Sequence, residues 1–150
     1  MQRGNYIKSP LNYTGGKYKI LKDIIPRFKP DINTFVDLFA GGFNVGINVK
    51  ANTIVCNDHI NYLNELYQYF QQTNTVELIN QIKERISFFG LSETNEEGYK
   101  KLRIEYNQNK KILDLFVLTC YSFNHQIRFN NKHEFNTPFG KERSSYNSSI

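Results

Sequence analysis

A glycine turn between two short apolar segments constrains the fold more than any other feature of the sequence. Residues 34–39 form a β-prone run, two glycines follow at positions 41 and 42, and residues 44–49 can start a helix. A second β-prone run covers residues 53–58. Strand, glycine turn, helix and strand in this order form the front half of a nucleotide-binding α/β unit. The sequence therefore predicts an α/β fold that begins with this unit.

Two aspartates flank the turn, and their positions indicate a ligand. Asp58 ends the second strand, where a carboxylate can accept hydrogen bonds from both hydroxyls of a ribose. Asp37 stands just before the glycines, where its charge suits an ammonium or sulfonium group and repels a pyrophosphate. The glycines do not form Gly-x-Gly-x-x-Gly, and Phe43 is bulky for a pyrophosphate turn. These points argue against a dinucleotide enzyme, whereas an ordinary turn with a solvated aspartate stays an alternative.

A second motif, Tyr13-Thr-Gly-Gly-Lys17, precedes a segment with apolar residues at helical spacing. Lys17 at the start of that helix can pair with a ligand carboxylate, and Tyr13 supplies an aromatic face beside it. The motif is not a phosphate loop, because Tyr18 stands where that loop needs Ser or Thr. For the motif alone, a capped helix with a solvated lysine is the favoured interpretation. We expect Pro26 and Pro30 to end the helix.

Beyond Asp58 the apolar pattern becomes helical. Four segments carry apolar residues at helical spacing, and the third is charged and expected mostly on the surface: residues 63–70, 78–86, 96–106 and 113–121. No third strand occurs where an α/β sheet would need one, so we interpret residues 60–123 as a helical insertion. Residues 127–136 contain a turn-prone centre and predict a hairpin or an extended loop.

The order of these motifs resembles that of the Dam-type DNA adenine methyltransferases, and the T-even phage Dam enzymes in particular. The resemblance rests on residues 13–17, on Phe35-Val-Asp-Leu-Phe-Ala-Gly-Gly42 and on Asn57-Asp58. It continues in residues 121–141, which contain the Arg-x-Asn and Pro-Phe-Gly-Lys signatures of the family's target-recognition segment. The resemblance implies a partial class I methyltransferase (Rossmann-like) sheet with a helical target-recognition insertion.

The resemblance also implies three regions and two sets of functional residues. Residues 1–59 would be the N-terminal part of an S-adenosylmethionine-binding core, residues 60–141 a mainly helical DNA-binding insertion, and residues 142–150 a polar tail leading to a missing catalytic half. The cofactor pocket would be lined by Tyr13, Lys17, Asp37, Phe39, Gly41 and Asp58. Double-stranded DNA would be contacted by Arg128, Asn130, Pro138 and Lys141, to which side-chain chemistry adds Asn124 and Arg143.

Two departures from the family pattern bear on these expectations. Phe43 stands where other members carry a third glycine, which leaves the cofactor affinity open. Glu142 follows Lys141 where the phage enzymes tend to carry a base-reading arginine, with Arg143 one position later. These residues therefore do not predict which DNA sequence the protein recognises.

Charge and aromatic residues support a DNA role only in general terms. The net charge of +5 favours an anionic partner, and no basic run stands out, so the basic residues would contact DNA at scattered points. Four phenylalanines in the recognition segment could stack on bases or form a small core: Phe123, Phe129, Phe135 and Phe139. For Phe123 and Phe139 we favour the core.

The remaining sequence features exclude several classes of protein. Cys56 and Cys120 lie in apolar stretches without metal-ligand spacing to the three histidines, which predicts two free thiols and no metal site. No apolar run reaches the ~20 residues of a membrane span, and the N-terminus has no signal-peptide core. We therefore expect a cytoplasmic protein of bacterial or phage origin.

The family's catalytic tetrapeptide, Asp-Pro-Pro-Tyr, is absent from these residues. The four prolines are all isolated: Pro10, Pro26, Pro30 and Pro138. The sequence thus predicts an adenine-specific DNA methyltransferase without its catalytic residues, and a C-terminal half supplied in trans is a candidate partner. An expressed fragment, a truncated or split gene, and a product that only binds DNA or a nucleotide all remain open.

Overall fold

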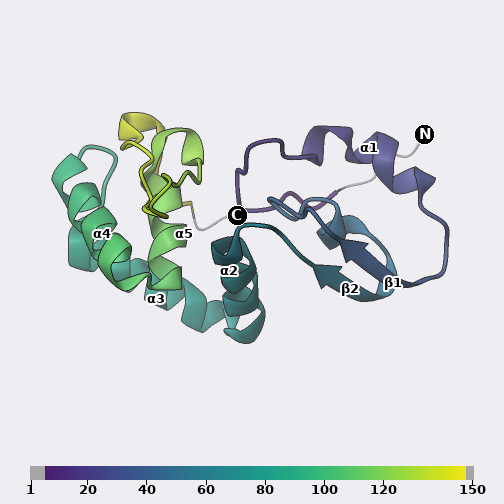
Figure 1. Ribbon diagram of the computed structural model, residues 1–150. Helices are drawn as coiled ribbons and strands as arrows, with labels where there is room; N and C mark the ends of the chain where they lie inside the picture. The colour runs from purple at the N-terminus through teal and green to yellow at the C-terminus, as the bar shows by residue number, and fades with distance from the viewer. Residues whose placement is uncertain (1–5, 148–150) are drawn as a thin grey trace. The chain divides into compact units, whose positions relative to one another are not determined.

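The computed structural model describes residues 6–147 and divides into two compact units. The first unit runs up to Asn64 and the second begins at Glu65. The boundary lies inside helix α2, which spans Asn61–Gln72. Figure 1 shows the strands in the first unit and the long helices in the second.

The sheet of the first unit consists of two parallel strands, β1 at Ile32–Asp37 and β2 at Ala51–Cys56. Their register pairs Ile32 with Ala51 and Asp37 with Cys56. The α/β prediction is confirmed at this level. Both strands begin and end two residues earlier than predicted, so residues 38–39 and 57–58 lie just beyond the strands.

The segment before β1 is a helix in three pieces rather than one continuous helix. It consists of η1 at Tyr18–Ile20, α1 at Leu21–Ile24 and η2 at Ile25–Arg27. Pro26 lies in the first turn of η2 and does not end the helix, because a first-turn residue needs no N–H donor. The helical conformation ends at Phe28, whose φ and ψ of −75° and 145° are extended.

The turn between the strands holds a single 3₁₀ turn, η3 at Gly46–Asn48, where the sequence predicted a longer helix. Phe43 adopts a positive φ of 58°, and its ring lies over Gly46 so closely that a Cβ at position 46 would overlap it. The buried Asp37 accepts a hydrogen bond from the N–H of Gly46 at 2.9 Å. The Phe43 ring and the Asp37 carboxylate therefore both hold the turn in place at Gly46.

One face of the sheet is covered, whereas valines on the other face are exposed. Leu21, Val45 and Val49 form a buried core, against which Phe35 of β1 packs. Val36 is next to Phe35 and so faces the opposite side of the sheet. Val36 and its register partner Val55 are 52% and 43% exposed.

The second unit is built from helices at all four predicted positions. After α2 come α3 at Thr75–Phe89, α4 at Glu96–Asn109 and α5 at Ile112–Tyr121. Asn74 and Asn95 cap α3 and α4 by accepting backbone N–H bonds. Helix α5 is buried on nearly every side, and α3 and α4 pack against it. The prediction of a mostly exposed third helix is wrong for one face of α4, where Tyr99, Leu102 and Tyr106 are buried.

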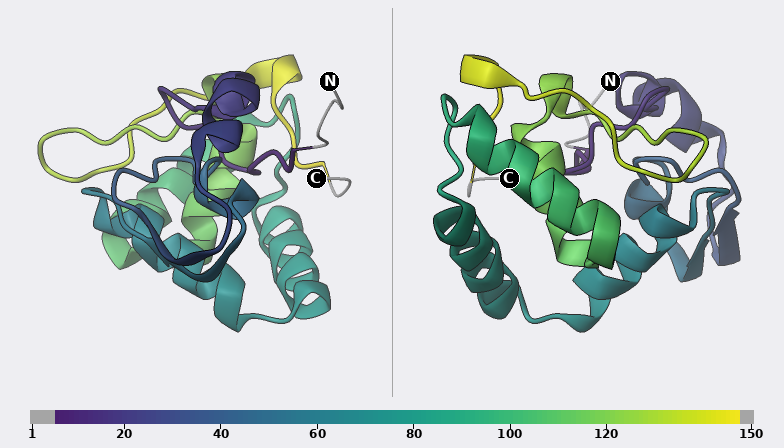
Figure 2. Two further views of the ribbon diagram at one scale, coloured as in Figure 1. Left: turned by 90° about the vertical axis from the view of Figure 1, so that its right-hand side faces the viewer. Right: turned by 60° about the vertical axis from the view of Figure 1, so that its left-hand side comes forward.

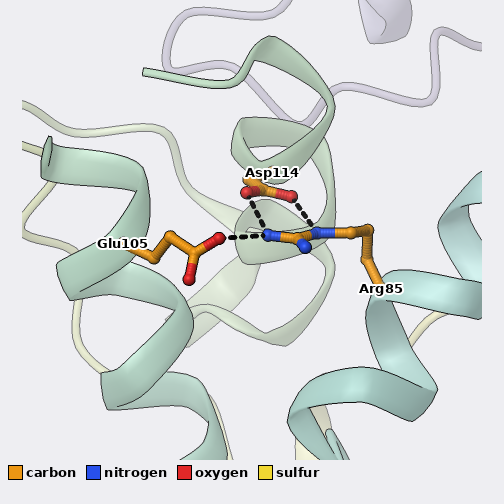
Figure 3. Close-up of polar contacts among 3 residues, drawn as sticks. All are labelled: Arg85, Glu105 and Asp114. Atoms are coloured by element: carbon orange, nitrogen blue, oxygen red, sulfur yellow. Dashed lines mark hydrogen bonds and ion pairs between the residues drawn. The ribbon is translucent and has the colours of Figure 1, made fainter. Parts of the chain in front are cut away.

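A buried ion pair joins the three helices α3, α4 and α5 (Figure 3). Asp114 of α5 is fully buried and accepts two hydrogen bonds of 2.7 Å from Arg85 of α3. Arg85 also contacts Glu105 of α4 at 2.9 Å. The guanidinium lies 4.8 Å from the centre of the Phe89 ring. The hydrogen bond with Asp114 is the largest of the effects that raise the pKa of Arg85, so the group stays charged.

The segment after α5 forms a long, narrow loop, which is yellow-green in Figure 2. Antiparallel bridges join Ser122 to Phe139 and Phe129 to Phe135, so residues 127–136 form a hairpin-like excursion as predicted. Short 3₁₀ turns at Phe123–His125 and Lys141–Arg143 lie on either side of it. Ser144 is buried, so the polar tail predicted to start at residue 142 still belongs to the fold at its beginning. Residues 1–5 and 148–150 of the predicted regions lie outside the described residues.

Among residues 6–147 no helix is long and apolar enough to span a bilayer. The same residues contain no group of three His, Cys, Asp or Glu side chains that could hold a metal ion. Both cysteines are free thiols, as predicted. Burial, followed by the charges of Asp37 and Asp58, raises the pKa of Cys56 to about 11.

Candidate functional site

A small pocket lies at the carboxyl ends of β1 and β2, where parallel α/β sheets bind their ligands. Its volume is about 180 Å³. Five of the six residues predicted for the cofactor line it, all except Asp37. The complete lining comes from the same few loops: Tyr13, Thr14, Gly15, Gly16, Lys17, Phe39, Ala40, Gly41, Gly42, Asn44, Val45 and Asp58. The two motifs that lie far apart in sequence thus form one pocket.

Asp58 is held rigidly at the end of β2. Its Oδ2 accepts a hydrogen bond from the N–H of Gly41 at 2.8 Å, and its Oδ1 accepts one from the N–H of Ile60 at 3.0 Å. Asn64 donates to its main-chain oxygen at 2.9 Å. Each carboxylate oxygen has a second lone pair that can accept from a ligand hydroxyl. The carboxylate is therefore both oriented and able to bind a diol.

The glycine turn places the main chain of Gly41 against the ring of Tyr13. Gly41 has a φ of 50°, and a Cβ there would lie 3.1 Å from the Tyr13 ring. A side chain at this position would be strained by both the conformation and the contact. Burial, and secondly the charge of Asp58, raises the pKa of Tyr13, so its hydroxyl stays protonated at neutral pH.

Lys17 and Phe39 lie on the pocket wall. The ammonium group of the half-buried Lys17 contacts the main-chain oxygen of Phe39 at 3.5 Å and has further donors for an anionic ligand group. The Phe39 side chain is 73% exposed, although it is large and apolar. An exposed aromatic ring at a pocket is typical of a surface that a ligand covers.

Asp37 does not line the pocket. Its carboxylate is buried and bound to Gly46, on the inner side of the turn. Sequence reasoning missed Asn44, whose side chain lines the pocket and accepts a hydrogen bond from the N–H of Ser9 at 3.1 Å. The sequence signal that could have identified it is an asparagine two residues after the glycine pair.

The residues predicted to contact DNA all lie between residues 124 and 143. Arg128 is exposed and donates to the side-chain and main-chain oxygens of Asn136, at 2.8 and 3.0 Å. Asn130 donates to Glu134 at 2.8 Å and accepts from two backbone N–H groups. The other four are exposed: Asn124, Pro138, Lys141 and Arg143. The loop thus brings these polar groups to the surface of the second unit.

The phenylalanines of this loop divide into buried and exposed ones. Phe135 and Phe139 are buried, and Phe129 packs edge-on against Phe135 with ring centres 5.8 Å apart. The core position predicted for Phe139 is confirmed. The same prediction for Phe123 is wrong, because its side chain is 49% exposed. Its main chain is instead bound to Pro138, in a turn where the next residue has a positive φ.

Parallel strands, a glycine turn and an oriented acid at the strand ends define a protein of the nucleotide-binding α/β class. The chain belongs to the D12 class of N6 adenine-specific DNA methyltransferases, whose family model matches residues 13–149. The family uses S-adenosylmethionine as its methyl donor.

Similar proteins include modification enzymes of restriction systems. The type II methyltransferase M.FokI of Planomicrobium okeanokoites is 54% identical over 146 residues, which cover 97% of this chain and 23% of the relative. The modification methylase StsI of Streptococcus sanguinis is 53% identical, over 97% of this chain and 22% of the relative. The DNA adenine methylase of Escherichia coli K12 is 31% identical, over 91% and 49%. The chain therefore spans about a quarter to a half of these relatives.

Proposed function

We propose that this chain provides the S-adenosylmethionine pocket and the target-recognition segment of a site-specific DNA adenine methyltransferase. Such an enzyme transfers a methyl group to the exocyclic amino group of adenine in duplex DNA. The observation that carries the proposal is the single pocket in which Tyr13, Lys17, Phe39, Gly41 and Asp58 come together. The more specific resemblance to the T-even phage Dam enzymes stays a prediction.

The chemistry of the pocket fits S-adenosylmethionine group by group. Lys17 would pair with the carboxylate of the methionine part, and Asp58 would accept hydrogen bonds from the ribose hydroxyls. Tyr13 and Phe39 offer aromatic faces to the remainder of the ligand. Asp37 would act through Gly46 by keeping the turn in place. When bound, the cofactor supplies an electrophilic methyl group on a sulfonium.

The loop after α5 is our candidate for the DNA contact. Arg128 can read guanine in the major groove, and Asn130 can read adenine or contact phosphates. Lys141 and Arg143 add positive charge next to the loop. We propose residues 1–59 as part of the methyltransferase core, residues 60–141 as the recognition insertion, and residues 142–150 as a connection.

Methyl transfer also needs acceptors that orient the adenine amino group outside the DNA stack. No Asp-Pro-Pro-Tyr occurs among these residues. We therefore propose that a further polypeptide segment, in cis or in trans, supplies the catalytic group. A binding protein that has lost the catalytic half is the second candidate, and it shares the pocket and the loop.

The test of the pocket is calorimetric binding of S-adenosylmethionine, or its demethylated product, in comparison with NAD. We expect tighter binding of the methionine-containing ligands. Asp58→Ala should weaken that binding by ~1–3 kcal/mol, because ribose hydroxyls lose their acceptor. The control is Asp23→Ala, which removes an exposed acid of the same unit outside the pocket. Equal affinities of wild type and Asp58→Ala would reject the ribose role.

A further inference from the structure

One face of α4 is bound along its length to the main chain of the loop after α5, which we call the recognition loop. Tyr99, Arg103, Asn107 and Lys110 are spaced by four, four and three residues, which places them on one side of the helix. We call these residues the α4 polar row. Each donates a hydrogen bond to a main-chain oxygen of the loop: Tyr99 to Thr137 at 2.8 Å, Arg103 to Thr137 at 3.4 Å, Asn107 to Phe135 at 3.1 Å and Lys110 to His133 at 2.7 Å.

The spacing of donors and acceptors shows where the helix matches the loop. The acceptor oxygens belong to every second residue of the loop, at positions 133, 135 and 137. Two residues of an extended chain advance about 6.6 Å, and four residues of a helix rise about 6 Å. The step from Asn107 to Arg103 therefore matches the step from Phe135 to Thr137, whereas Tyr99 and Arg103 share the oxygen of Thr137. The helix takes the place that a neighbouring strand would have in a sheet.

Asn107 is the member of the row that makes the most strand-like contact. Its Nδ2 donates to the main-chain oxygen of Phe135, and its Oδ1 accepts from the N–H of the same residue at 2.8 Å. A side-chain amide that satisfies both backbone groups of one residue fixes that residue in place and in orientation. Phe135 is also buried, so water cannot replace these two hydrogen bonds when Asn107 is removed.

The loop transmits this orientation to its outer side. Phe135, Thr137 and Phe139 are buried, whereas Glu134 and Pro138 are exposed, so the segment alternates like a strand with one face inward. The residue between the first two buried ones is Asn136, whose side chain and main chain hold the guanidinium of Arg128. The position of Arg128 thus depends on Asn136, and that of Asn136 on the main chain beside it.

We propose that Asn107 is a positioning residue for DNA recognition and acts through Phe135 and Asn136 on Arg128. The α4 polar row fixes the main chain of residues 133–137, and this main chain fixes the base-reading side chains. The inference rests on the proposed function, because it takes the loop as the DNA reader. It adds a residue that contacts no DNA and still controls sequence preference.

The experiment combines two readouts on the 150-residue chain. Hydrogen exchange followed by NMR reports the protection of the Phe135 amide without any DNA. Enrichment of sequences from a randomised duplex pool reports the preference, and binding to an unselected duplex reports the general affinity. The test variant is Asn107→Ala, and the matched control is Gln108→Ala, an exposed amide one position along α4. Asn136→Ala removes the side-chain contact to the Nε of Arg128 and leaves the α4 polar row in place.

We expect Asn107→Ala to lose about tenfold in Phe135 protection and about fivefold in sequence preference, with its affinity for unselected duplex unchanged. Asn136→Ala should lose the preference and keep the protection, and Gln108→Ala should keep both. If Asn107→Ala does not fold, Asn107→Leu replaces it, because Leu has a similar size and neither accepts from nor donates to the main chain of Phe135. The same two readouts then decide.

Two outcomes would overturn the inference alone: unchanged Phe135 protection in the Asn107 variant, or lost protection with an unchanged preference. The second outcome would reduce Asn107 to a stabilising residue. A wild-type chain without any sequence preference would instead reject the loop as the DNA reader. That result would overturn the proposed function, and the positioning role with it.

Discussion

At the scale of single residues, the pair Phe43 and Gly46 is the most specific feature of the glycine turn. Gly46→Ala would push a methyl group into the Phe43 ring and should cost ~1–3 kcal/mol of the free energy of unfolding. Phe43→Gly removes the ring and also relieves a positive φ. The double variant should therefore recover most of the loss. Urea denaturation measures all three, and an equal cost of Gly46→Ala in both backgrounds would contradict the contact.

The two aspartates of the turn show what sequence can and cannot predict about a site. The sequence predicted Asp58 at the end of a strand and Asp37 within the neighbouring one, whereas Asp37 ends β1 and Asp58 lies two residues beyond β2. It assigned both acids to the ligand, because the direction of a side chain does not follow from the sequence. Asp58 turns to the pocket, whereas Asp37 is bound by the N–H of Gly46. That N–H becomes available only through the local turn, which no periodicity predicts.

At the scale of helices, the ion pair of Figure 3 should dominate the stability of the second unit. Asp114→Ala leaves the Arg85 guanidinium in a largely buried place with only Glu105 as an acidic partner, and should cost ~3–5 kcal/mol. The control is Glu105→Gln, whose side chain is 39% exposed in the wild type, with an expected cost below ~1 kcal/mol. Thermal unfolding distinguishes the two. Similar losses in both variants would show that burial does not set the strength of this pair.

Helix positions were predictable because α2, α3 and α5 have apolar residues on a regular face. The buried face of α4 was not, since it has a single leucine beside two tyrosines and a glycine, in a helix with many charges. Tyrosine suits such a place because its ring can be buried while its hydroxyl binds a main-chain oxygen, as Tyr99 does with Thr137. The strand-like loop was only partly predictable, because its partner is a helix and not another strand.

The loop as an element should bind DNA in a salt-dependent way. If three or four phosphates are neutralised, the slope of log affinity against log salt should be roughly −3 to −4. Arg128→Ala should cost ~1–3 kcal/mol and relax the sequence preference, if Arg128 reads a base. Fluorescence anisotropy at several salt concentrations measures both quantities. A salt-insensitive titration, or an unchanged preference in the variant, would count against the loop as the reader.

At the scale of the whole molecule, we expect residues 1–150 alone not to methylate DNA. Orientation of reacting groups can supply ~7–11 kcal/mol of a barrier, so losing the group that orients the adenine amino nitrogen should lower turnover by many powers of ten. The assay is transfer of labelled methyl from S-adenosylmethionine to adenine-containing duplex. Adding a matching C-terminal polypeptide should restore transfer. Robust methylation by the 150 residues alone would show that catalytic residues lie among them.

The exposed valines of the sheet offer a structural reason why an added C-terminal polypeptide should restore methyl transfer. Val36 and Val55 leave an apolar surface on β1 and β2, which further strands and helices of a methyltransferase core could cover. The family and the order of its parts were predictable from motifs. A partial sheet was also predicted, and the two parallel strands of the described residues agree with it.

The bonds between α4 and the recognition loop have a consequence for how such enzymes diversify. The α4 polar row makes its hydrogen bonds to main-chain atoms of the loop, and every amino acid provides the carbonyl oxygens that it binds. Outward side chains at positions such as 134 and 136 can therefore be exchanged while the backbone keeps its course. A lineage could acquire a new target sequence by a few surface substitutions, without rebuilding the scaffold that presents them.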